Sequence, residues 1–284
     1  MRPGQWTKNL LVFAGVIFGQ KLLDPASRLT ALAAFGVFCL LSSAVYLLND
    51  VRDREADRVH PVKSRRPIAS GALGSGTAVT AAAVLAGVAL IAAAAISAPF
   101  ALVAAAYLAL MAVYSWSLKH VAILDVLSLS GGFLLRAAGG AVAVQVTFSH
   151  WLLLLTLLLA LFLALSKRRA ELVALSGEAQ AHRRSLGEYT PYLLDQMIGV
   201  VTASTLLAYA FYTISAETLQ KFGTDRLLWT VPFPLYGIFR YLYLMHQREG
   251  GGNPSETLLE DRPILVCVGL WGAAVIAILY GPWR

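Results

Sequence analysis

Charged residues are scarce in this chain, at 14% of its 284 residues. Hydrophobic residues make up 58%, and the mean hydropathy is +0.66. A soluble globular domain carries about 25% charged residues, so this composition excludes an ordinary soluble domain. A Gly/Ser-rich linker is also lacking, and no polar segment is long enough to form a separate soluble domain. The long apolar runs predict a polytopic helical membrane protein.

Cysteine is nearly absent, with only Cys39 and Cys267, and each lies inside an apolar run. We therefore expect two buried thiols, and neither a disulfide nor a metal pair. The first apolar run lacks a small-residue cleavage site, which predicts a first membrane span and no cleaved signal peptide. The net charge of +7 could suggest nucleic acid. Because the cations flank apolar runs, we expect the positive charge to set the orientation of the chain in the membrane and to bind phosphate. We therefore expect no nucleic-acid partner.

The apolar runs predict an all-α fold of about nine transmembrane helices in a single domain over residues 1–284. The expected spans are 9–23, 29–49, 74–97, 99–118, 122–146, 150–167, 195–216, 227–246 and 263–281. With these spans, 16 cations lie on the side of the N-terminus and 5 on the other side. The excess predicts a cytoplasmic N-terminus, an external C-terminus, and cytoplasmic polar loops at 50–73 and 168–194.

The densest polar stretch, Asn49–Gly71, follows directly on the second predicted span. Asn49, Asp53 and Asp57 are spaced by four residues, so a helix would place them on one face. Three such oxygen-bearing side chains at the water end of a membrane helix predict a Mg²⁺ site with room for substrate phosphates. The alternative is an ordinary cytoplasmic loop, which does not need acids at this spacing. His60-Pro61 is expected to end the helix.

A second polar segment, Ser166–Glu171, ends the sixth predicted span and is mainly cationic. Lys167 and Glu171 have helical i, i+4 spacing, and Arg168 is adjacent. The segment could be a positive-inside anchor, or its cations could bind phosphate. Arg136 and Arg240 lie within predicted spans, where a charge is costly and must face a cavity or a partner. Asp125 could partner Arg136 only across bent or neighbouring segments.

The pattern Asn49-Asp50-x-x-Asp53-x-x-x-Asp57, followed by HPVKSRRPIASG, resembles the first aspartate-rich motif of the UbiA superfamily of intramembrane prenyltransferases. The resemblance implies nine helices around a cavity open to lipid, with the motif at its cytoplasmic end. Further segments resemble the phosphoribosyltransferase branch of that superfamily: RPGQWTKNLLVFAG, YSWSLKHVAILDV, GFLLRAAGGA and LSKRRAEL. Where typical members carry a second aspartate-rich motif, this chain has Ser166–Glu171, which departs from the pattern in carrying more positive than negative charge.

The branch resemblance implies transfer of a 5-phosphoribosyl group from phosphoribosyl diphosphate to a polyprenyl (decaprenyl-type) phosphate, on the route to a lipid-linked arabinose donor for cell-wall arabinan. It implies a plasma-membrane enzyme with its active site on the cytoplasmic side, and leaves open a homo-oligomer. Mg²⁺ would be held by Asn49, Asp53 and Asp57, with Asp50 nearby, and the three aspartates would be catalytic. The expected phosphate ligands are Lys63, Arg66, Lys167 and Arg168, with Lys8, Lys119 and Tyr189 as further contacts.

Two alternatives remain at this point. One is a prenyltransferase that moves a polyprenyl chain from its diphosphate onto an aromatic acceptor, against which the missing second aspartate motif counts. The other is a transporter or lipid-binding membrane protein, which would be expected to carry its polar residues near the middle of the membrane. Here they concentrate at the cytoplasmic ends of the spans, with Arg136 as the main exception.

Overall fold

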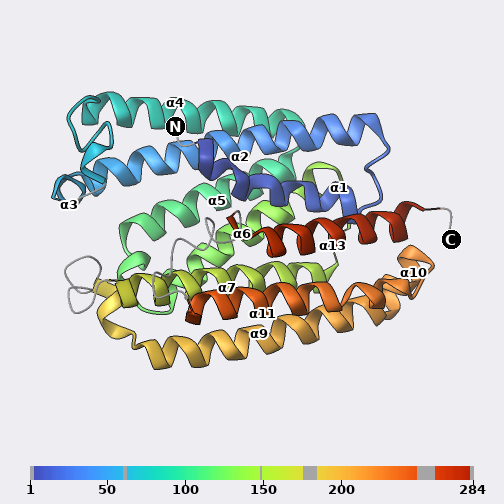
Figure 1. Cartoon of the computed structure of the whole chain (residues 1–284). Coiled ribbons are helices and arrows are strands. Elements are labelled where there is room, and N and C mark those ends of the chain that lie inside the picture. The colour runs from blue at the N-terminus through green and yellow to red at the C-terminus, as the bar shows by residue number, and fades with distance from the viewer. Residues whose placement is uncertain (1–2, 60–62, 148, 175–183, 248–259, 282–284) are drawn as a thin grey trace. The chain divides into compact units, whose positions relative to one another are not determined.

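The computed structural model describes residues 3–59, 63–147, 149–174, 184–247 and 260–281 (Figure 1). Within these residues every regular element is a helix and no strand occurs. The chain divides into two compact units. Unit 1 comprises residues 1–118 and 131–148, and unit 2 comprises residues 119–130 and 149–284. His60-Pro61, the expected end of the acidic helix, lies outside the described residues.

Seven helices in the described part of the chain are long and apolar enough to cross a membrane. They are α2 (Pro25–Arg52), α4 (Ser75–Ile96), α5 (Ala98–Trp116), α6 (Leu124–Ala143), α7 (His150–Ala174), α9 (Pro191–Ile214) and α13 (Arg262–Tyr280). The shorter elements are η1 (Pro3–Phe13), α1 (Ala14–Phe18), α3 (Arg54–Arg58), η2 (Lys63–Arg65), η3 (Leu118–His120), η4 (Arg184–Glu188), α10 (Ala216–Phe222), η5 (Arg226–Thr230) and α11 (Pro232–Gln247). The prediction of an all-α, multi-pass membrane protein is confirmed.

The expected count of nine spans is not confirmed, because two of the predicted spans do not form one long helix. The first, 9–23, falls on the 3₁₀ helix η1 and the five-residue α1. The eighth, 227–246, is divided between η5 and α11, and α11 has only 16 residues. A proline is best tolerated in the first turn of a helix. Pro232 and Pro234 therefore place the start of α11 after the apolar run has already begun.

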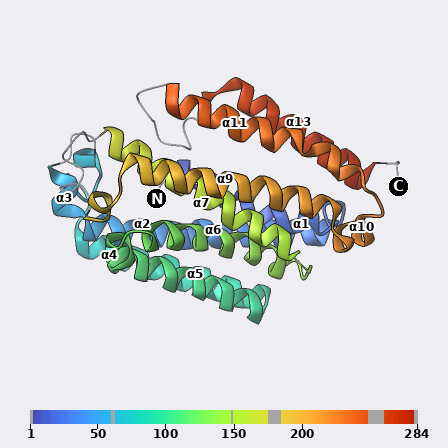
Figure 2. The same cartoon turned by 90° about the horizontal axis from the view of Figure 1, so that it is seen from below.

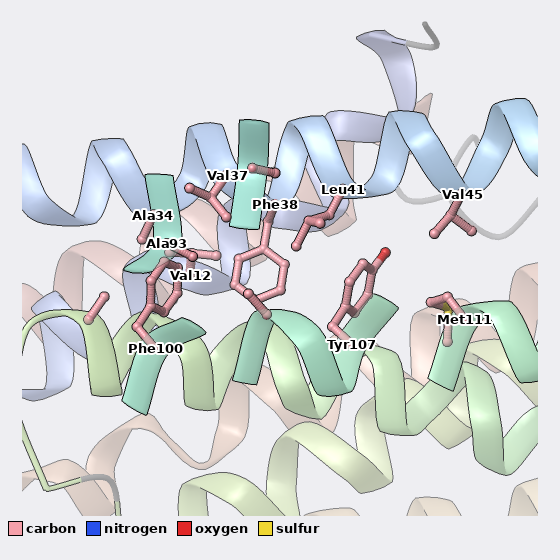
Figure 3. Packing of buried hydrophobic residues seen from close by; sticks show 13 residues of the cluster. Val12, Ala34, Val37, Phe38, Leu41, Val45, Ala93, Phe100, Tyr107 and Met111 are labelled. Carbon is pink, nitrogen blue, oxygen red and sulfur yellow. The ribbon is translucent and has the colours of Figure 1, made fainter. Parts of the chain in front are cut away.

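Unit 1 is built on α2, with α4 beside it (Figure 1). The turn between α4 and α5 occurs at the predicted place, where the Ser97 hydroxyl accepts a hydrogen bond of 3.2 Å from the Phe100 N–H and Pro99 follows in the first turn. The core contains Phe38 of α2 between two rings of α5 (Figure 3). Its ring packs edge-on against Phe100 and Tyr107, with centroids 6.0 and 5.3 Å away.

The N-terminal elements of unit 1 approach α6 backbone to backbone. A Cβ atom on Gly140 would lie 1.9 Å from the carbonyl oxygen of Val12, and one on Gly15 would lie 2.6 Å from the nitrogen of Ala141. Real Cβ atoms do not approach other atoms this closely, so only glycine fits at these two positions. The contact holds η1 and α1 firmly against α6.

Unit 2 contains two helix pairs, α7 beside α9 and α11 beside α13 (Figure 2). Phe162 of α7 meets Tyr241 of α11 edge-on, with centroids 5.2 Å apart. The side chains of Thr190 and Asp261 accept hydrogen bonds from backbone N–H groups in the first turns of α9 and α13. Such caps satisfy N–H groups that have no partner within the helix, so both helices begin where the sequence supplies a capping side chain.

Candidate active site

The acidic motif of unit 1 lies where α2 gives way to α3. The helix ends at Arg52, and Asp53 follows with φ −87° and ψ 8°. The backbone still continues the turn, because the Asp53 N–H donates to Asn49 and the Asp57 N–H donates to Asp53, at 2.9 and 2.8 Å. The amide of Asn49 donates to a carboxylate oxygen of Asp53 at 2.9 Å. The predicted i, i+4 neighbourhood of these two residues is confirmed.

Arg66 joins the other two acids of the motif. Its Nη1 lies 2.5 Å from Oδ2 of Asp57 and 3.2 Å from Oδ1 of Asp50. The Asp57 side chain is only 5% exposed, whereas that of Arg66 is 26% exposed. The Arg58 side chain donates to the carbonyl oxygen of Ala69 at 3.3 Å, which links α3 to the segment just after Arg66. Arg66 thus places one positive charge beside two converging carboxylates.

The donors of this cluster suit a hard divalent cation, because Mg²⁺ prefers carboxylate and carbonyl oxygens. Among the described residues, however, no three His, Cys, Asp or Glu side chains are close enough together to hold a metal by themselves. A metal here would take part of its coordination from water and substrate phosphate, as Mg²⁺ usually does. The convergence of Asp50 and Asp57 on a cation shows that the local arrangement favours positive charge.

Unit 2 contains a buried ionic cluster at the start of α6. The Arg168 side chain is 2% exposed and that of Asp125 is fully buried. Arg168 Nε lies 2.7 Å from Oδ2 of Asp125, and its Nη1 lies 2.5 Å from Oε2 of Glu171. Ser185 Oγ contacts Asp125 at 3.5 Å and donates to the Lys119 carbonyl at 3.0 Å. Three segments distant in sequence are therefore joined through one carboxylate.

The Tyr189 hydroxyl completes this cluster. It donates to Oδ1 of Asp125 at 2.9 Å and accepts from the N–H of Ile123 at 2.6 Å. Burial, followed by the negative charge of Asp125, raises the pKa of Tyr189 to about 12, so the hydroxyl remains a donor at neutral pH. Ile123 has a φ of 68°, which is rare for a β-branched residue. Such a conformation is retained only where surrounding contacts hold it.

The remaining predicted ligands are distributed over both units. In unit 1, Lys8 is half-buried on η1 and Lys63 is exposed on η2. In unit 2, Lys119 is buried on η3, and Lys167 is half-buried on α7 with its Nζ 3.9 Å from Oε1 of Glu171. The structure brings together Asn49 with Asp53, Asp50 with Asp57 through Arg66, and Arg168 with Tyr189 through Asp125. The roles of all these residues toward substrate and metal stay predictions.

The suggested pairing of Asp125 with Arg136 is wrong, since Asp125 pairs with Arg168. Arg136 instead donates to Oδ1 of Asn9 at 2.8 Å and to the Tyr107 hydroxyl at 2.7 Å. Asn9 was missed because 127 residues separate it from Arg136 and no local pattern links them.

The second in-span arginine, Arg240, pairs with Asp261 at 3.0 Å. A signal for this pair was available in the sequence. Asp261-Arg262-Pro263 is typical of a helix start, where a capping acid would lie beside the neighbouring helix.

Comparison with known sequences gives consistent results. The profile of the UbiA prenyltransferase family matches residues 10–256. The decaprenyl-phosphate phosphoribosyltransferase of Mycolicibacterium smegmatis is 35% identical over 99% of this chain and 91% of its own length. That of Corynebacterium glutamicum is 34% identical over 99% of this chain and 85% of its own length.

Solved structures agree on the fold. A UbiA homolog from Archaeoglobus fulgidus bound to GPP and Mg²⁺ superposes with a TM-score of 0.77 and 19% identity, over 98% of this chain and 97% of that chain. The apo UbiA homolog from Aeropyrum pernix K1 gives 0.68 and 14%, over 96% and 98%. The helical fold, the aspartate-rich motif at the end of α2 and the full-length relatives lead to one conclusion: the chain belongs to the UbiA prenyltransferase family.

Proposed function

We propose that this protein transfers the 5-phosphoribosyl group of phosphoribosyl diphosphate to a polyprenyl phosphate of the decaprenyl type, with release of pyrophosphate. The observation that carries the proposal is the similarity to decaprenyl-phosphate phosphoribosyltransferases at 34–35% identity over 99% of the chain. The cationic Ser166–Glu171 segment supports it, because a donor with a diphosphate and a separate phosphate, together with a lipid phosphate, calls for many positive groups. Prenyl transfer to an aromatic acceptor is the less favoured function. The GPP-bound structure is only 19% identical to this chain, so the similarity supports a shared fold and not a shared substrate.

We assign the acidic motif of unit 1, together with Arg66, to binding of the diphosphate. Asn49, Asp53 and Asp57, with Asp50 beside them, would hold Mg²⁺, which when bound neutralises charge on the diphosphate and on the departing pyrophosphate. Arg66 already lies beside two of these carboxylates, so its guanidinium is well placed for a phosphate bound next to them. Lys63, exposed on the neighbouring η2, can add a second positive charge.

The bond changes need little covalent help from the protein. An oxygen of the lipid phosphate attacks C1 of the ribose, the bond from C1 to the diphosphate oxygen breaks, and pyrophosphate leaves with the electron pair. The attacking phosphate is already ionised at neutral pH, so no general base is required. The chain's contribution is to position both substrates and to stabilise the charge that develops on the leaving group.

In unit 2 we assign different roles to two adjacent cations. The guanidinium of Arg168 is buried and contacted by Asp125 and Glu171, which makes it a positioning residue for the Ser185–Tyr189 segment. Lys167 is half-buried, and its long side chain can direct the ammonium toward a phosphate. Lys119 and Lys8 are assigned weaker contacts of the same kind.

The function is tested by incubating the purified protein with labelled phosphoribosyl diphosphate, Mg²⁺ and a polyprenyl phosphate. A labelled lipid is the expected product.

The specific prediction is that Lys167→Ala weakens use of phosphoribosyl diphosphate roughly ten- to a hundredfold, the value of a charge-assisted hydrogen bond. Lys167→Asp should be worse, because a carboxylate adds repulsion to the loss of the cation.

A second assay with prenyl diphosphate and 4-hydroxybenzoate separates the two enzymatic readings. A donor bound through a second metal would tolerate the added carboxylate of Lys167→Asp, or gain from it. Activity in this assay alone, improved by the aspartate, would reject phosphoribosyl transfer and support prenyl transfer.

We further propose that the protein resides in the plasma membrane with the acidic motif on the cytoplasmic side, as the excess of 16 cations over 5 implies. A reporter fused after Arg284 should then be external, and one inserted within 175–183 should be cytoplasmic. Because the N-terminus is expected to be cytoplasmic, a cytoplasmic C-terminus would mean that an even number of segments crosses the membrane. The predicted membrane crossing of a segment outside the seven long helices would then be wrong.

A further inference from the structure

Arg136 carries a buried positive charge in the membrane-spanning part of unit 1. It lies on α6 and is only 5% exposed. Its Nε donates to Oδ1 of Asn9 at 2.8 Å and its Nη2 donates to the Tyr107 hydroxyl at 2.7 Å. The guanidinium also stacks over the rings of Tyr107 and Phe133, with its central carbon 4.7 and 5.1 Å from their centroids. All of these partners are electrically neutral.

No carboxylate in the described part of the chain pairs with Arg136. The other arginine inside a predicted span, Arg240, has Asp261 at 3.0 Å. A buried charge without a counter-ion is costly, and an arginine within a membrane segment is retained where a partner or ligand uses it. An uncharged side chain could make the same hydrogen bonds to Asn9 and Tyr107. The positive charge of Arg136 therefore needs a separate explanation.

The unused donors of Arg136 retain access to open space. Its Nη1 makes no hydrogen bond in the described structure, yet it is not among the fully buried polar atoms that lack a partner. The small exposed part of the side chain therefore includes this nitrogen. Gly132, one turn earlier on α6, leaves room beside it, because a Cβ there would come within 3.7 Å of Nη1 and 2.9 Å of Met111 Cε.

We propose that Arg136 binds a phosphate group, held by the free N–H groups of Nη1. A planar guanidinium with two parallel donors suits the oxygens of a phosphate. Asn9 fixes the orientation of the fork, and is itself held by the side chains of Cys39 and Ser42 at 3.3 Å. This would be a binding site separate from the acidic motif.

The position along α2 connects this site to the proposed reaction. Ser42 lies seven residues before Asn49, or about 10 Å along the helix axis. A ribose with a diphosphate at C1 and a phosphate at C5 extends over a similar length. The phosphate at Arg136 could therefore be the 5-phosphate of the donor or the phosphate of the polyprenyl acceptor. This choice between two sources rests on the proposed function, whereas the phosphate site itself does not.

Asn9→Asp is the decisive variant, because it gives Arg136 a counter-ion with almost no change in shape. If Arg136 serves only packing, the new ion pair should leave ligand binding unchanged. If it binds phosphate, neutralising the guanidinium should weaken binding roughly ten- to a hundredfold. Arg136→Gln should weaken it to a similar extent. Arg240→Gln is the matched control, since that arginine already has a carboxylate and should leave ligand affinity unchanged.

Binding is measured in detergent, without metal or turnover, as ligand-induced shifts of the thermal unfolding temperature. The probes are ribose 5-phosphate against ribose, and decaprenyl phosphate against decaprenol. We expect the wild type to prefer the phosphorylated member of one pair, and Asn9→Asp to lose that preference. The affected pair identifies the source of the phosphate.

Wild-type affinity for both phosphorylated probes in Asn9→Asp would overturn the proposal, as would a wild type that prefers neither of them. If Arg136→Gln does not fold, Asn9→Asp still decides the question. The two failures have different readouts: failure of the proposed function is a lack of labelled lipid in the turnover assay, and failure of the phosphate site is an Asn9→Asp variant that keeps the wild-type preference for a phosphorylated probe.

Discussion

Asp57→Asn is expected to lower turnover by about a hundredfold or more while the protein stays folded. Asp57 is 5% exposed and lies beside Asp50 on the same guanidinium of Arg66. Asparagine keeps the size and one acceptor oxygen but removes the negative charge that a metal and its bound diphosphate would require. Asp53→Asn should have a similar effect, since its carboxylate is oriented by Asn49 at 2.9 Å. EDTA should abolish activity of the wild type.

The motif supplies its own control in Glu55. That side chain is 77% exposed and pairs only with Arg58 on the described surface, three residues away. Surface pairs of this kind contribute little, so Glu55→Gln should change turnover by less than about twofold. Initial rates with labelled phosphoribosyl diphosphate, together with thermal unfolding of each variant, provide the comparison. Full activity in Asp57→Asn would remove that residue from the site, and equal losses in Asp57→Asn and Glu55→Gln would point to a general charge effect.

The second large effect concerns stability. Asp125→Ala should destabilise the protein by about 3–5 kcal/mol, because it leaves the 2% exposed guanidinium of Arg168 without its buried partner. Tyr189 would also lose its acceptor, and Ser185 would lose a polar contact. The measurement is unfolding in detergent, by heat or by denaturant. A loss below about 1 kcal/mol would show that water or Glu171 replaces Asp125 fully.

Arg169 provides the matched comparison, since it is adjacent to Arg168 on α7 but only partly buried. It pairs with Asp195 at 2.5 Å, with the two side chains 15% and 33% exposed. Asp195→Ala should cost only about 0–1 kcal/mol. Replacing Asp125 and Arg168 together by leucine and methionine should recover much of the loss, because no unpaired charge remains buried.

The sequence predicts well what depends on neighbours along the chain. Apolar length places α4 and α5 within one or two residues of their observed ends, and four-residue spacing predicts the Asn49–Asp53 contact. The same spacing is less reliable for Asp57, because α2 ends before Asp53 and the chain continues as the separate helix α3. Its partner Arg66 is nine residues further on, across a return loop that helical periodicity does not describe.

Contacts between distant segments could not be predicted in the same way. Asp125 and Arg168 are 43 residues apart, and the choice of Arg168 over Arg136 depends on how α6 and α7 fold. Periodicity identifies an in-span arginine as costly but does not identify its partner. Likewise, the apolar run 227–246 has the length of a span, and only the position of its prolines indicates that α11 is shorter.

The packing of η1 against α6 has a consequence for biosynthesis. Asn9 leaves the ribosome 127 residues before Arg136, which at typical synthesis rates is a delay of roughly ten seconds. During that time the side-chain oxygen of Asn9 cannot accept its hydrogen bond from Arg136. The backbone of Val12 likewise cannot pack against Gly140. The segment that contains Asn9 and Val12 is therefore synthesised before the rest of unit 1 but is among the last of its parts to reach its final place. The membrane-insertion machinery must keep it available until α6 arrives.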